Sequence, residues 1–124
     1  MKNKLYKKLA IRVSTDSKFG RGHIVRCLAI RSHIKCKTAW YIDKRENEVI
    51  KMIPKYDDIV IEEGVSSCSK IKDSIKKKAF SMVLLDSYMI SHAEYLKIRK
   101  YVPLVVISDE FKNINADLAI YPHP

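Results

Sequence analysis

The segment 14–28 holds the side chains of this sequence that are best suited to chemistry. Gly20 and Gly22, two of the three glycines in the chain, lie just before His23. Glycine lets a backbone turn tightly and come close to a ligand, and a neutral imidazole can accept a proton. We therefore treat His23 as a candidate general base and expect its ring to be reachable from solvent. The alternative is a histidine that only hydrogen-bonds the neighbouring loop.

Arg26 follows His23 by three residues, so a helix would carry both side chains on one face. The Arg26 guanidinium could bind an anionic group of a ligand or pair with Asp16, and the sequence favours neither. A helix beginning here also offers free N–H groups and its positive dipole end to a phosphate or a developing oxyanion. The dinucleotide-binding fingerprint is not matched, because Val25 takes its third glycine position and no acidic ribose ligand is evident.

The elements that must position this segment follow from hydrophobic periodicity. Strands are predicted at residues 9–13, 38–42, 58–62, 80–85, 104–107 and 117–121, and helices at 22–34, 47–53, 67–79 and 91–101. Strands that alternate with helices in this way pair in parallel through right-handed crossovers. We predict a single α/β domain with an open, Rossmann-like, mostly parallel sheet of about six strands and helices on both faces.

Polar residues gather where ligands bind in such sheets, beyond the carboxyl ends of the strands. Tyr88 follows the fourth predicted strand, and Asp109 and Glu110 follow the fifth. Tyr88 is either a residue of the site or a rim aromatic, and the acidic pair either faces the site or begins a helix or a turn. Asp86 is interpreted as a cap for the turn after its strand.

Composition narrows the class of protein. Lys and Arg number 24 against 14 Asp and Glu, and the resulting net charge of +10 favours anionic ligands. The apolar share of 47% argues against a disordered chain, and no apolar run reaches the roughly 20 residues of a membrane span. The cysteines at 27, 36 and 68 have no zinc-site or disulfide spacing, and those at 27 and 68 fall on apolar stripes. We expect a cytoplasmic protein without a metal or a membrane partner, with these two thiols in the core.

A family resemblance rests on the run Asp16-x-x-x-Gly20-x-Gly22-His23-x-x-Arg26-Cys27-Leu28 after the first strand. It resembles the start of the UDP-sugar hydrolases of pseudaminic acid biosynthesis, which release UDP from a diacetamido-trideoxy-altropyranose. Those enzymes are similar to the spore-coat polysaccharide glycosyltransferase-like proteins and, more distantly, to GT-B glycosyltransferases. The later segments 85–88, 107–110 and 117–120 resemble the same family in the same order.

The resemblance implies a role for each matching residue. His23 would be the general base that activates water for attack at the anomeric carbon of the sugar, with UDP as the leaving group and no metal or other cofactor. Tyr88 would contact the substrate near the reacting centre. The other matching positions would bind or surround the sugar: Asp16, Gly20, Gly22, Arg26, Asp109 and Glu110.

Members of that family have two such domains, and the second holds most of the uridine and diphosphate contacts. The resemblance implies that residues 1–124 are the amino-terminal half of a GT-B-type enzyme, without the carboxy-terminal nucleotide-binding domain. We expect little or no hydrolase activity from this half alone, because binding energy from remote parts of a substrate supports the chemistry. A second domain or another chain would complete the cleft around the UDP-amino sugar. The surface left by the missing domain should be partly apolar and could drive the formation of a homodimer.

Two alternative functions stay open. The same architecture fits the acceptor-side domain of a GT-B glycosyltransferase, in which a sugar hydroxyl takes the place of water. A basic binding module without catalysis fits the net charge. Nucleic acid is not favoured as its partner, because aromatic residues do not interleave with basic ones on any predicted face.

Overall fold

Six parallel strands form one sheet in the computed structural model, which describes residues 7–14, 22–64, 66–77, 80–86, 90–108 and 116–120. The strands are β1 (Lys8–Val13), β2 (Lys37–Ile42), β3 (Asp58–Ile61), β4 (Met82–Asp86), β5 (Leu104–Ile107) and β6 (Leu118–Ile120). Their order across the sheet is β3-β2-β1-β4-β5-β6, and every neighbouring pair is parallel. The predicted Rossmann-like α/β sheet is confirmed.

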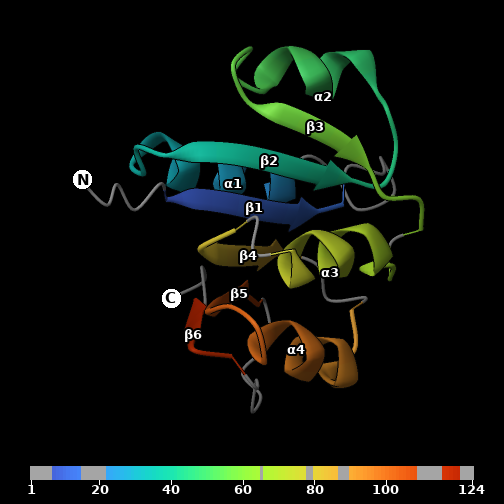
Figure 1. Ribbon diagram of the computed structural model, residues 1–124. Coiled ribbons are helices and arrows are strands. Elements are labelled where there is room, and N and C mark those ends of the chain that lie inside the picture. Colours follow the sequence, from blue (N-terminus) through green and yellow to red (C-terminus); the bar gives the residue numbers. More distant parts are fainter. Residues whose placement is uncertain are drawn as a thin grey trace.

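Helices cover both faces of this sheet. They are α1 (Gly22–Ser32), α2 (Asn47–Met52), α3 (Ser69–Lys76) and α4 (His92–Arg99). In Figure 1, α3 and α4 lie side by side on the near face, and α1 lies behind β1 and β2. Among the segments described here, no helix is both long enough and apolar enough to cross a membrane.

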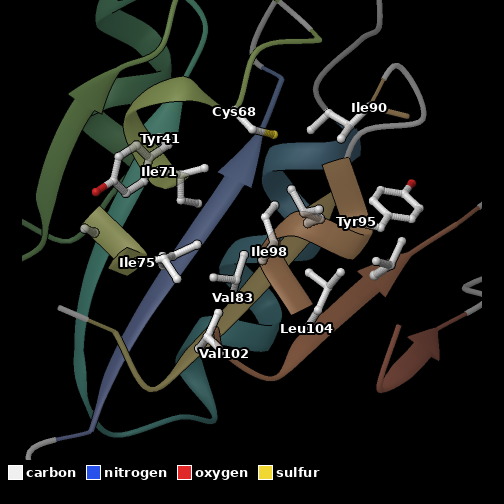
Figure 2. Close-up of a cluster of buried hydrophobic side chains, with 14 residues drawn as sticks. Tyr41, Cys68, Ile71, Ile75, Val83, Ile90, Tyr95, Ile98, Val102 and Leu104 are labelled. Carbon is white, nitrogen blue, oxygen red and sulfur yellow. The ribbon is translucent and has the colours of Figure 1, made fainter. Parts of the chain in front are cut away.

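Alternate side chains of the strands supply two separate cores. The core under α3 and α4, shown in Figure 2, includes Ala10, Tyr41, Val83, Leu85, Leu104, Ile71, Ile75, Tyr95 and Ile98. The core under α1 and α2 includes Leu9, Ile11, Val13, Trp40, Ile42, Leu84, Ile24, Cys27 and Val49. Each large aliphatic side chain buried in this way contributes about 1.5–3 kcal/mol. The two cores therefore fix the position of the helices on the sheet, and both predicted core thiols, Cys27 and Cys68, are buried.

Side chains from outside the helices define where two of them begin. Ser91 accepts a hydrogen bond from the Glu94 N–H at 3.4 Å, as the predicted cap of α4 requires. The Glu62 carboxylate, which follows β3, accepts the N–H groups of Lys70 and Ile71 at 2.6 and 3.3 Å. These two bonds satisfy free N–H groups in the first turn of α3, which starts two residues later than the sequence predicts.

Arg12 is a charged side chain in the middle of the sheet, fully buried on the α3 face of β1. Its guanidinium donates to backbone carbonyls of Gly64, Ser67 and Tyr41 at 2.6, 3.0 and 3.3 Å. Burial lowers the pKa of Arg12 from its ordinary value. Gly64 has φ +92°, a left-handed conformation that favours glycine. The buried arginine thus holds the turn between β3 and α3 against the sheet.

Candidate active site

The sheet reverses its direction of growth between β1 and β4. The chain passes from β1 through α1 to β2 on one side, and β4 lies on the other side of β1. The last residues of these two neighbours, Val13 and Asp86, are register partners. Ligands of open α/β sheets bind outside the carboxyl ends of the strands at such a switch point.

His23 and Asp86 meet at this point. His23 is the second residue of α1, and its Nδ1 lies 2.8 Å from Oδ1 of Asp86, the last residue of β4. An ionised carboxylate only accepts hydrogen bonds, so the Nδ1–H of His23 is the donor. In the neutral ring, the lone pair is then on Nε2. This is the tautomer in which Nε2 can take a proton.

Arg26 holds the same carboxylate with two hydrogen bonds. Its Nε donates to Oδ2 of Asp86 at 2.6 Å, and its Nη2 donates to Oδ1 at 2.5 Å. Nη2 also lies 3.1 Å from Nδ1 of His23, because both nitrogens approach the same oxygen. Two parallel bonds of this kind fix the plane of a carboxylate as well as its position. Arg26 thereby orients Asp86 toward the imidazole.

Cys27 completes the surroundings of Asp86. Its Sγ lies 3.5 Å from Oδ2 of Asp86, and its side chain is fully buried. Burial, with the nearby Asp86 charge as a smaller cause, raises the pKa of Cys27 well above its ordinary value. The group is therefore a thiol that donates to the carboxylate and not a thiolate nucleophile.

The structure corrects two expectations about these residues, those for His23 and Asp86. His23 is only 8% exposed, so its ring is buried at the edge of the sheet and not openly reachable from solvent. Arg26 pairs with Asp86, and its predicted pairing with Asp16 lies outside the described residues. Asp86 is fully buried and receives three side chains of α1, a role that its interpretation as a turn cap missed. The signal available in the sequence was a single carboxylate at the end of a continuous apolar strand.

Gly22 is placed at the first position of α1, directly before His23. A Cβ built on Gly22 would meet no atom of the described residues within 4 Å. Packing against the described part of the chain therefore does not require a glycine here. The other predicted site residues lie outside the described residues: Asp16, Gly20, Tyr88, Asp109 and Glu110.

Asp43 adds a second acidic group at the carboxyl edge of the sheet. It follows β2 directly, and its Oδ2 accepts a hydrogen bond from Oγ of Ser14 at 3.0 Å. Both side chains are buried. Dinucleotide-binding sheets carry their acidic ribose ligand at this end of the sheet, about 20 residues after the glycine loop. The glycine pattern of this chain is not the dinucleotide fingerprint, and Asp43 is not evident as such a ligand from the sequence alone.

A second buried arginine–aspartate pair lies on the same face but contains no histidine. Arg31 donates to both carboxylate oxygens of Asp57 at 3.0 and 2.9 Å, and Trp40 Nε1 donates to the same carboxylate at 2.9 Å. Asp57 lies between α2 and β3, at the start of a strand and not at its carboxyl end. This pair joins α1 to the segment before β3, and it offers a matched control for Asp86.

Comparison with known proteins does not place the chain in a family: no protein-family model and no curated protein matches it. Within the described ranges, no group of three or more His, Cys, Asp or Glu side chains could hold a metal ion. Fold and site together define the class as an α/β protein with a Rossmann-like sheet. Its imidazole–carboxylate pair lies at the switch point between β1 and β4.

Proposed function

We propose that His23 is the general base of a hydrolase that cleaves UDP from a UDP-diacetamido-trideoxy sugar, with this chain as the amino-terminal domain. The observation that carries the proposal is the 2.8 Å contact between His23 Nδ1 and the Asp86 carboxylate at the β1–β4 switch point. The class of substrate comes from the resemblance of the segment 16–28 to those hydrolases.

The reaction needs one proton acceptor and one leaving group. A water molecule attacks the anomeric carbon and gives a proton to Nε2 of His23. A carbon–oxygen bond forms to the water oxygen, and the bond from the anomeric carbon to the diphosphate oxygen breaks. The electron pair of that bond leaves with UDP. Asp86 holds the imidazole in the tautomer that can accept the proton and stabilises the imidazolium that results.

Arg26 has a positioning role in this proposal. Its side chain is 23% exposed and makes two hydrogen bonds to Asp86, so its charge is already balanced before a substrate binds. When His23 becomes protonated, the group of three side chains gains one positive charge. That charge develops while negative charge accumulates on the departing diphosphate, and the two stabilise each other.

A second domain or chain holds the uridine and the diphosphate in this proposal. Binding energy from those groups would then position the anomeric carbon against the water and His23. The domain by itself should release little UDP. The high net charge of +10 suits an anionic substrate, although it does not distinguish one anion from another.

The test is UDP release from a UDP-diacetamido-trideoxy sugar by the full-length natural protein. His23→Asn should lower kcat by about 10²–10⁴-fold, the usual contribution of a general base. Asp57→Asn, the matched change in the pair without a histidine, should retain kcat wherever the protein stays folded. Unaltered turnover in the His23 variant would exclude the base assignment. Release that requires an added sugar acceptor would instead identify the glycosyltransferase of the same architecture.

A further inference from the structure

A groove between α3 and α4 lies on the opposite face of the sheet from His23. It has a volume of about 370 Å³, and its lining residues come from α3, from α4 and from the two residues that follow α4. The two helices lie side by side in Figure 1. The residues that line it are Ser69, Lys72, Asp73, Ile75, Lys76, Lys97, Ile98, Lys100 and Tyr101. None of them belongs to the His23–Asp86 site, so the groove is separate from that site.

Lysines line both walls of this groove. Lys72 and Lys76 are four residues apart on α3, and Lys97 and Lys100 are three apart at the end of α4. Side chains at these spacings lie on one face of a helix, about 5–6 Å apart at Cβ. Each wall therefore presents a row of ammonium groups. Four lysines against Asp73 give the lining a net charge of +3, of which Glu94, paired with Lys72, offsets one.

The floor of the groove is anchored in the core. Ile75 of α3 and Ile98 of α4 are 3% and 0% exposed, and Figure 2 shows both within the cluster under the two helices. The Nζ of Lys72 also bonds the Glu94 carboxylate of α4 at 2.7 Å. These contacts join the two helices that carry the lysines. Tyr101, about half exposed, lies at the end of the groove beside Lys100.

We propose that this groove binds an acidic peptide segment of a partner protein. Carboxylates of the segment would pair with the two rows of lysines, and the lysine stems and the Tyr101 ring would cover its apolar side chains. Asp73 and Ser69 have acceptor oxygens for the N–H groups that a peptide backbone offers. Tyr101 is the single aromatic side chain among the described residues of the lining, so the groove has no row of aromatic rings on which successive nucleic-acid bases would stack.

The experiment measures fluorescence anisotropy of a labelled peptide of about ten residues, with alternating Glu and Leu, on the intact protein. The double variant Lys76→Glu with Lys97→Glu should weaken binding about ten-fold or more, since it places repelling charges on both walls. Lys51→Glu with Lys55→Glu is the matched control, because it changes the net charge equally at exposed positions outside the groove. The control should bind the peptide within about two-fold of the unmodified protein, the difference that long-range charge leaves at physiological salt.

Three outcomes would overturn the proposal. Equal weakening of peptide binding in both double variants would mean that only the net charge matters. If the unmodified protein does not bind the peptide even at low salt, the groove is not a peptide-binding site. Tighter binding of a polythymidylate oligonucleotide that displaces the peptide would assign the groove to nucleic acid. Circular dichroism verifies the fold of each double variant. If Lys76→Glu with Lys97→Glu unfolds the protein, Lys76→Gln with Lys97→Gln takes its place. A peptide of alternating Lys and Leu should bind the double variant Lys76→Glu with Lys97→Glu better than it binds the unmodified protein.

Discussion

Asp86 accepts a hydrogen bond from Nδ1 of His23 at 2.8 Å across 63 positions of sequence. One residue ends β4, and the other lies in the first turn of the helix that follows β1. The parallel pairing of β1 with β4 brings them together, because it sets Asp86 level with Val13 at the carboxyl edge of the sheet. The chemistry of the site is therefore a consequence of strand order.

Replacing Asp86 by Asn should change the tautomer of His23. The Asn amide can donate to Nδ1, which would move the ring proton to Nε2 and remove the base. Turnover of the proposed hydrolysis should fall by about 10²-fold or more, as in other histidine–carboxylate pairs. Nitrogen chemical shifts of the imidazole report the tautomer directly. Asp57→Asn is the control, and a His23 spectrum that is the same in both variants would contradict the assignment.

Replacing Arg26 by Met should destabilise the fold. The substitution leaves the buried Asp86 carboxylate without its balancing charge, at a cost of about 3 kcal/mol in the free energy of unfolding. This value is at the low end for such a loss, because Arg26 is partly exposed and water can reach its place. Urea unfolding measures the change. A loss below about 0.5 kcal/mol, the usual effect of a surface substitution, would show that Arg26 does not support Asp86.

Replacing Gly22 by Ala separates stability from substrate binding. The added methyl group meets no atom of the described residues within 4 Å, and alanine favours helix more than glycine does by up to about 1 kcal/mol. Thermal unfolding should therefore occur at the same or a slightly higher temperature. If substrate approaches the backbone here, the KM for the UDP sugar should rise. A variant that is stable and has an unchanged KM would remove Gly22 from the proposed binding residues.

Cys68 makes the fold sensitive to alkaline pH. Burial raises the pKa of this thiol from 9.0 to about 12. Between these two values the unfolded chain loses a proton that the folded chain keeps, so rising pH favours unfolding. One thiol contributes a slope of up to about 1.4 kcal/mol per pH unit. Burial raises the pKa of Tyr41 and Tyr95 as well, and their effect has the same sign.

The measurement for Cys68 is the free energy of unfolding at several pH values above 9.0, for the unmodified protein and for Cys68→Ala. The alanine variant should be less stable at neutral pH but should lose stability more slowly as the pH rises. Parallel pH curves for the two proteins would show that this thiol does not titrate differently in the folded and unfolded chains.

Local patterns in the sequence predict the helices and strands well. Alternating and continuous apolar runs mark every strand, and β5 has the predicted bounds of 104–107. The predicted helix 67–79 starts too early, because its beginning depends on the Glu62 carboxylate at the end of β3 and not on a side chain of its own first turn. Boundaries set by a neighbouring element leave no local signal.

The contacts of buried charged residues could not be predicted in the same way. Spacing places His23 and Arg26 on one face of a helix, but their common partner Asp86 comes from a strand that only the sheet order brings near. Arg12 lies within an apolar strand, and its partners are backbone carbonyls from β2 and from the turn before α3. Carbonyl groups are present at every residue, so no side-chain pattern marks the ones that an arginine will use.

The most direct measurement is an NMR titration of the His23 imidazole with a UDP-diacetamido-trideoxy sugar. The account predicts a ring protonated at Nδ1 in the free protein, and resonances of both ring nitrogens that move on binding, while His33 and His92 stay unchanged. A neutral ring protonated at Nε2, or His23 resonances unaffected by saturating UDP sugar in the protein that turns it over, would contradict the role of the His23–Asp86 pair.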